Sequence, residues 1–147
     1  MFDVSSPFYL DKVIKKVFTL GKTERLKSRK LIEQVFNSRQ SFNVFPLRIF
    51  YLFGSVSAIT LQAGFGVSTK NFKKAVDRNR VKRLIREAYR LQKGTLQELL
   101  VEKNLHLVLF IIYSGKELPD FTLVSERIVI SLHRLIHLVN DKSSSNN

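Results

Sequence analysis

The sequence contains no cysteine, which excludes disulfide frameworks, thiolate metal sites and cysteine nucleophiles and is typical of a reducing compartment. Its longest apolar run, 107–113, has seven residues and is far shorter than the ~18 to 20 residues of a membrane helix. The N-terminus lacks the basic start, apolar stretch and cleavage site of a secretory signal. These absences predict a cytoplasmic protein without a membrane segment.

The length of 147 residues favours one domain, and 44% hydrophobic with 25% charged residues is typical of a folded globular protein. Residues 1–21 show no sustained hydrophobic period and are interpreted as an N-terminal extension, mobile or loosely packed. Residues 142–147 are rich in serine and asparagine and are interpreted as a disordered tail. The sequence therefore predicts one domain over residues 22–141.

Positive charge is the strongest signal, with a net charge of +13. Residues 1–93 contain 20 Lys and Arg against 6 Asp and Glu, whereas residues 94–147 contain 5 against 6. Ten of the basic residues fall within 70–93, where only Asp77 and Glu87 oppose them. Such local density indicates a polyanionic partner, and nucleic acid is favoured over a membrane surface because a folded core surrounds the cluster.

The stretch 75–92 has the spacing of an amphipathic helix. At about 100° per residue one arc is apolar, with Val81, Leu84, Ile85, Ala88 and Leu91. The opposite arc is basic, with Arg78, Lys82, Arg83, Arg86, Arg90 and Lys93. A solvated helix face usually mixes both signs of charge, whereas this arc has almost no acidic partner. The pattern favours phosphate binding over a merely solvated face.

Aromatic residues precede this helix. A short helix beginning after Ser28 places Leu31, Ile32, Val35 and Phe36 on one side, with Arg25, Lys27, Arg29 and Lys30 near its start. Strands are predicted at 47–53 and 58–67, joined by a turn at 54–55. Because a strand has two faces, Phe50 cannot share one with Ile49 and Tyr51. Aromatics on an open sheet face beside basic residues can stack single-stranded nucleic acid, although most single phenylalanines belong to a core.

The second half predicts a further helical stretch to residue 102, a buried strand at 105–113, and a last helix capped by Asp120 or Thr122. Signals of catalysis are weak. His133 and His137 lie four residues apart as in a zinc helix, yet Arg134 stands where a metalloprotease has its general base, so both are interpreted as surface or satisfied interior histidines. A free-standing nuclease is disfavoured because no paired carboxylates or histidine cluster accompany the basic face.

The run 74–90, KAVDRNRVKRLIREAYR, closely resembles the Arg-Asn-Arg signature of the bacterial ribonuclease P protein subunit family. The resemblance extends to Arg25-Leu26-Lys27 with Val35-Phe36, and to the GFGVS run at 64–68 before a lysine-rich loop, and it covers about residues 19–141. It implies a single-domain α+β sandwich, in the order helix, three strands, helix, strand, helix, with a left-handed crossover. General rules for parallel strands predict the opposite hand.

The resemblance also implies a function. Members of the family are accessory proteins of a ribonucleoprotein endoribonuclease, in which an RNA using bound Mg²⁺ removes the 5′ leader of precursor tRNA. The expected partners are that catalytic RNA, in a 1:1 complex with a monomer of this chain, and precursor tRNA. The protein alone is expected to be inactive, with no catalytic residue and no metal of its own. The predicted RNA-binding residues are Lys70, Lys74, Arg78, Asn79, Arg80, Lys82, Arg83, Arg86, Arg90, Arg25 and Lys27, and the predicted leader-binding cleft is formed by Phe36, Phe50 and Ile32.

Two positions depart from the family pattern. Ile32 stands where the family often has a second cleft aromatic, and Lys73 replaces a common loop glycine. An aliphatic side chain still gives apolar cover, but it weakens one stacking contact. The alternative function is a structural RNA-binding protein of ribosomal or chaperone type, which composition alone does not separate from a ribonuclease P subunit.

Overall fold

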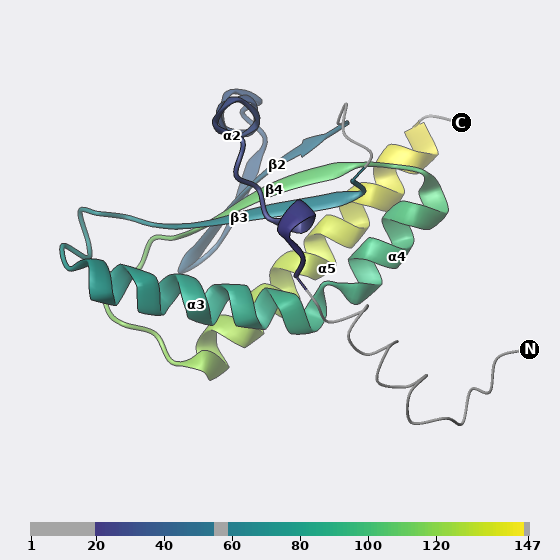
Figure 1. Ribbon diagram of the computed structural model, residues 1–147. Coiled ribbons are helices and arrows are strands. Elements are labelled where there is room, and N and C mark those ends of the chain that lie inside the picture. The colour runs from purple at the N-terminus through teal and green to yellow at the C-terminus, as the bar shows by residue number, and fades with distance from the viewer. Residues whose placement is uncertain (1–19, 55–58, 146–147) are drawn as a thin grey trace, which may run out of the picture.

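The computed structural model describes residues 20–54 and 59–145 (Figure 1). The elements, in chain order, are a short 3-10 helix η1 (Lys22–Glu24), α2 (Arg29–Asn37), β1 (Ser41–Val44), β2 (Leu47–Phe53), β3 (Leu61–Val67), α3 (Ala75–Gln92), α4 (Gly94–Lys103), β4 (Leu107–Tyr113) and α5 (Phe121–Ser145). The predicted α+β class and element order are confirmed, and α4 is the further helical stretch predicted to residue 102. The handedness of the crossover stays a prediction.

The helix starts follow from local capping. The Ser28 side chain accepts a hydrogen bond from the Leu31 N–H at 3.3 Å, and Asp120 Oδ1 accepts one from the Leu123 N–H at 2.8 Å. Both satisfy backbone donors that have no partner within the first turn of a helix. Asn104 adopts φ 54° after α4, a left-handed conformation that ends the helix. The caps at Ser28 and Asp120 explain why the predicted starts of α2 and α5 match the structure.

The sheet has the strand order β1-β2-β4-β3, so the last strand in the chain lies between two earlier ones. β4 pairs antiparallel with β2 and parallel with β3. The predicted turn at 54–55 falls partly on Ser55, which lies outside the described residues, and β2 and β3 do not pair with each other. The parallel pair requires a long crossover, which α3 and α4 provide.

Helices α3, α4 and α5 cover one face of the sheet and form the main core with it (Figure 1). Alternate residues of the central strands point to this side, among them Ile49, Leu109 and Ile111, each with less than 2% of its surface exposed. They meet the buried stripe of α3, which consists of Val81, Ile85, Ala88 and Tyr89. This layer holds α3 against the sheet and leaves its other side to solvent.

The opposite face is covered by α2, whose Val35 is fully buried beside Val108 of β4. The side chains of β2 and β4 that point this way include Phe50 and Phe110. Their neighbour β3 presents Gly64 and Gly66 here, and the Phe110 ring lies over both. A Cβ at position 64 would be 2.7 Å from Phe110 Cδ2, so the ring occupies the space that a side chain would need.

The bounds of the domain differ slightly from those predicted. Leu20, assigned to the N-terminal extension, is buried in the main core. At the other end, α5 continues through the start of the predicted tail to Ser145. Residues 1–19 of the extension, and residues 146–147, lie outside the described residues. Within the described part of the chain no helix has the length and apolar character needed to cross a membrane.

Candidate nucleic-acid interface

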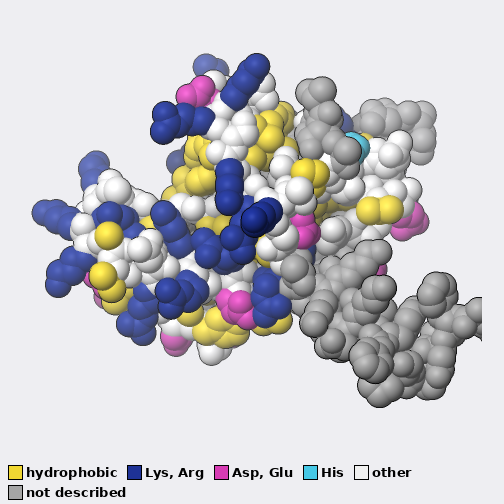
Figure 2. Space-filling model, in the orientation of Figure 1, with side chains coloured by type: hydrophobic (Ala, Val, Ile, Leu, Met, Phe, Trp, Pro, Cys, Tyr) yellow, Lys and Arg dark blue, Asp and Glu magenta, His cyan; other side chains and the backbone are white. Residues whose placement is uncertain are grey.

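The basic residues of α3 and of the loop before it form a continuous surface, called here the basic face. Figure 2 shows Lys and Arg gathered over this region, with hydrophobic side chains visible beneath α2. Lys70, Lys74, Asn79, Arg80 and Arg83 are exposed, whereas Lys82, Arg86 and Arg90 are half-buried. Cations presented at this density on one side attract a phosphate backbone.

Arg78, at the start of α3, stabilises the preceding loop and also belongs to the basic face. Its Nη1 donates to the carbonyl oxygens of Phe72 at 2.8 Å and Lys73 at 2.7 Å. The side chain therefore braces the loop that carries the lysines, and its remaining N–H groups are left to meet an anion. The first arginine of the Arg-Asn-Arg run thus shapes the basic face as well as belonging to it.

Two other arginines of α3 have protein contacts. Arg90 Nε donates to Glu87 Oε2 at 3.1 Å, and this hydrogen bond lowers the pKa of Glu87 and raises the pKa of Arg90. The Arg86 guanidinium lies 6.0 Å from the centre of the Phe65 ring. Both side chains stay partly exposed, so these contacts orient them at the surface.

The prediction that Lys93 belongs to the basic face is wrong. The Lys93 side chain is 1% exposed and pairs through Nζ with the Glu24 carboxylate of η1. Lys93 follows Tyr89 by four residues on the buried stripe of α3, which points it inward. Leu91, assigned to the apolar arc, is instead exposed, and Tyr89 takes its place in the core. Burial, and to a lesser extent the Glu24 carboxylate, raises the pKa of Tyr89, which therefore stays neutral.

An aromatic cluster lies on the other face of the sheet, between α2 and the strands. The Phe36 and Phe50 ring centroids are 4.7 Å apart in an edge-to-face arrangement, and Phe36 lies 5.1 Å from Phe110. All three rings are half-buried. The Arg48 guanidinium lies 4.9 Å from the Phe50 ring centre. The structure thus brings Phe36 and Phe50 together, as predicted, in contact with an aromatic and a cation that sequence reasoning did not assign.

The remaining predicted residues lie around this cluster. Ile32 is half-buried and, like Phe50 and Phe110, packs against the cluster of Leu26, Val35 and Val108. Arg25 and Lys27 are exposed, and Arg25 forms a backbone bridge to Ala63 that places this segment along the free edge of β3. The sequence could have placed Phe110 in this cluster, because successive side chains of a strand alternate between its two faces. Phe110 therefore points away from the face of Leu109 and Ile111. His133 and His137 are exposed on α5.

We expect sulfate to raise the melting temperature more than chloride at matched ionic strength. An anion that binds only the folded state stabilises it by mass action, and the basic face offers such a site. At about ten times its Kd, sulfate should add about 3 to 6 °C. Differential scanning calorimetry in the two salts measures this, and identical melting curves would count against anion binding.

Fold and surfaces together define a class: a single-domain α+β RNA-binding protein with a basic helix and a separate aromatic face. The family model described as Ribonuclease P matches residues 20–135. The chain belongs to the ribonuclease P protein family, and it is thus the accessory protein of a ribonucleoprotein endoribonuclease that acts in tRNA 5′ processing. Proteins of this family function with ribonuclease P RNA.

Individual relatives support the assignment. The ribonuclease P protein component of Porphyromonas gingivalis strain W83 is 41% identical over 119 residues, covering 80% of this chain and 87% of the relative. That of Chlorobium phaeobacteroides is 37% identical over 131 residues, covering 81% and 89%. The solved Staphylococcus aureus RNase P protein superposes with a TM-score of 0.60 at 17% identity, over 78% of this chain and 95% of that one. At this identity the likeness concerns the fold.

Proposed function

We propose that the chain binds the catalytic RNA through the basic face and holds the 5′ leader of precursor tRNA on the aromatic cluster. The observation that carries the proposal is the separation of two chemically different surfaces on opposite sides of the sheet. One presents cations on a rigid helix, whereas the other presents half-buried rings beside Arg48. Duplex phosphates suit the first surface, and unstacked bases suit the second.

The aromatic cluster fits a single strand because its rings are held by protein contacts before RNA arrives. Phe36 is fixed against Phe50 and Phe110, so stacking a base on them costs little side-chain ordering. Arg48 adds a cation at the rim that can meet a leader phosphate. Ile32 supplies apolar cover without a ring.

The proposal assigns the Mg²⁺ ions to the RNA partner, in a 1:1 cytoplasmic complex with one copy of this chain. Among the residues that the structure describes, no group of three or more His, Asp or Glu side chains lies close enough to hold a metal ion. What this chain's own residues supply is RNA binding and orientation. The RNA supplies the metal-assisted cleavage.

Reconstitution tests the proposal. The purified full-length chain is combined with ribonuclease P RNA from the same genome and given a leader-bearing precursor tRNA. We expect the mixture to cleave at lower Mg²⁺ concentration than the RNA alone, and the RNA-free protein not to cleave. Mg²⁺-dependent cleavage by rigorously RNA-free protein would overturn the accessory role.

Replacing Phe36 or Phe50 with alanine is expected to weaken binding of precursor tRNA to the holoenzyme by roughly 1 to 3 kcal/mol each. Mature tRNA lacks the leader, so its affinity should change little. A purely structural phenylalanine behaves differently, because its truncation costs ~3 to 5 kcal/mol of stability and impairs every RNA interaction together. The measurement is the affinity for both tRNAs together with the melting temperature of each variant.

Phe42→Ala is the matched control. Phe42 is also half-buried and contacts Tyr51 at 6.0 Å between ring centroids, but it lies on the sheet face toward α5. It should lose stability to a similar degree without discriminating between the two tRNAs. Equal losses for precursor and mature tRNA in the Phe36 and Phe50 variants would assign these rings to the core.

A further inference from the structure

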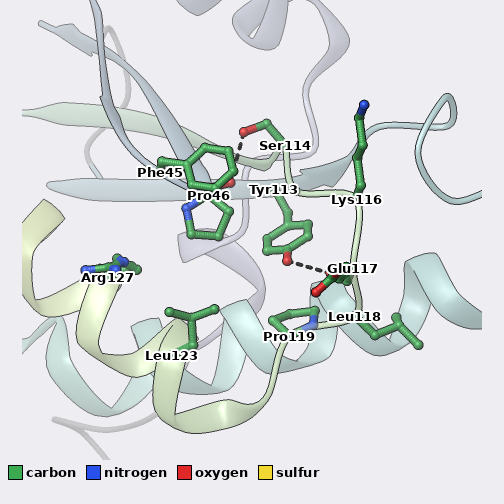
Figure 3. Close-up of a pocket in the computed structure, with 11 residues that line it drawn as sticks. Phe45, Pro46, Tyr113, Ser114, Lys116, Glu117, Leu118, Pro119, Leu123 and Arg127 are labelled. Carbon is green, nitrogen blue, oxygen red and sulfur yellow. Dashed lines mark hydrogen bonds between the residues drawn. The ribbon is translucent and has the colours of Figure 1, made fainter.

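A pocket of about 460 Å³ lies at the end of the sheet where the β1–β2 turn meets the β4–α5 loop (Figure 3). Phe45 and Pro46 form one wall, Leu123 of α5 and Pro119 form the opposite one, and Tyr113 lies between them. The Tyr113 hydroxyl donates to the Glu117 carbonyl oxygen at 2.6 Å, which holds the loop in place. The volume falls within the range of small-molecule sites.

Phe45 is the most unusual residue of this pocket. It is 75% exposed, more than any other phenylalanine among the described residues, and its ring lines the pocket. Leu118, on the rim, is 45% exposed. Exposed apolar side chains gathered at a preformed cavity mark an interaction site rather than a random surface.

The charged groups of the pocket favour an anion with a flat apolar part. Arg127 lines the pocket, and its Nε is buried without a hydrogen-bond partner in the described structure. A guanidinium carries five N–H donors, so Arg127 can donate to an acceptor that enters the pocket. Lys116 extends from the rim, and Glu117 is the acidic residue of the lining. An occupant with a π face for Phe45 and a phosphate or carbonyl for Arg127 fits this arrangement.

The loop that lines the pocket is hydrogen-bonded to the loop before α3, where the basic face begins. Asn71 Nδ2, in the loop before α3, donates to the carbonyl oxygens of Ser114 at 3.1 Å and Gly115 at 3.2 Å, on the pocket's own loop. The Phe72 ring contacts the Tyr113 ring with centroids 5.9 Å apart. Phe72 also supplies a carbonyl to Arg78. The segment leading into α3, where the basic face begins, therefore contacts the loop that lines the pocket.

We propose that this pocket binds an unpaired nucleotide of ribonuclease P RNA, with its base stacked on Phe45 and an acceptor of the nucleotide paired with Arg127. The inference rests on the proposed binding of that RNA to the basic face. It extends the interface beyond α3 to a site that holds an extrahelical base. Stacking of this kind tolerates every base, because each has a π face.

The test uses the full-length chain with ribonuclease P RNA from the same genome. Phe45→Ala should weaken binding about 5- to 150-fold at fixed salt, with an unchanged melting temperature because the ring is largely exposed. Phe45→Trp keeps a stacking surface and should retain affinity. Val101→Ala is the matched control, since Val101 is 64% exposed on α4, and it should bind as the wild type does.

A photocrosslinking amino acid at position 45 identifies the occupant. Crosslinks from position 45, but not from position 101, to ribonuclease P RNA in the assembled holoenzyme would support the pocket. Crosslinks to precursor tRNA alone, or wild-type affinity in Phe45→Ala, would overturn it. A failure of the proposed function is distinguishable, because the wild-type chain would then show no salt-dependent RNA binding at all.

Discussion

The affinity of the chain for ribonuclease P RNA is expected to fall on the order of a thousandfold between 50 and 200 mM monovalent salt. This follows if about six phosphates are neutralised by the basic face, since each releases counterions when the complex forms. Each cation removed from a phosphate contact should flatten the slope of log affinity against log salt by about one unit. Filter binding or fluorescence anisotropy over this salt range measures the slope.

The structure predicts different results for three variants of the basic face. Arg83→Gln removes an exposed cation and should flatten the slope while leaving stability unchanged. Asn79→Ala removes a neutral, directional partner and should weaken binding with little change in slope. Arg78→Gln should also lower the melting temperature, because Arg78 braces the loop carbonyls of Phe72 and Lys73.

Lys103→Gln is the control for charge alone, because this exposed lysine lies at the end of α4, outside the basic face. Its slope should match that of the wild type within error. The same affinity at both salt concentrations, or an equal effect of Lys103→Gln and Arg83→Gln, would refute localised phosphate binding by the basic face.

The largest loss of stability is expected from Glu24→Gln. It removes the charged partner of Lys93, whose side chain is 1% exposed, and leaves an ammonium group buried. Breaking a buried ion pair from one side typically costs 3 to 5 kcal/mol, which is about 6 to 20 °C in melting temperature for a domain of this size. Urea unfolding of the RNA-free protein measures the change.

The reverse variant should cost less. Lys93→Met leaves the Glu24 carboxylate, which is 18% exposed and keeps hydrogen bonds from the Gly21 N–H at 2.8 Å and from Gln97 at 3.4 Å. Replacing both residues with methionine removes both charges and should recover much of the loss. A Glu24→Gln protein as stable as the wild type would contradict a stabilising role for this pair.

Local features of the fold were predictable from the sequence. The helix α3 was predicted with its observed bounds, and the starts of α2 and α5 depended on Ser28 and Asp120, whose side chains act within a single turn. The two faces of β2 followed from alternation alone, which placed Phe50 opposite Ile49. These signals depend on neighbours within a few residues, so a single sequence carries them.

Non-local features were not predictable in the same way. The position of β4 between β2 and β3 depends on pairing between strands more than 40 residues apart, and β1 is too short to show a period. Lys93 was wrongly assigned to the basic face. Its buried ion pair depends on Glu24, which lies 69 residues earlier in the chain. The pocket beside Phe45 and the contact of Phe110 with Phe36 arise only when distant loops and strands meet.

The ring of Phe110 lying across Gly64 and Gly66 has a consequence for how this protein tolerates mutation. The depth of the aromatic cluster is determined by the main chain of β3, because no side chain stands between that strand and the ring. Replacing one aromatic residue of the cluster with another changes the contacts of that residue. It leaves the distance between the cluster and the main chain of β3 unchanged. A single added methyl group at position 64 would lie 2.7 Å from Phe110 Cδ2, so the ring would have to shift. Gly64, which has no side chain, is therefore the position of this surface that tolerates substitution least.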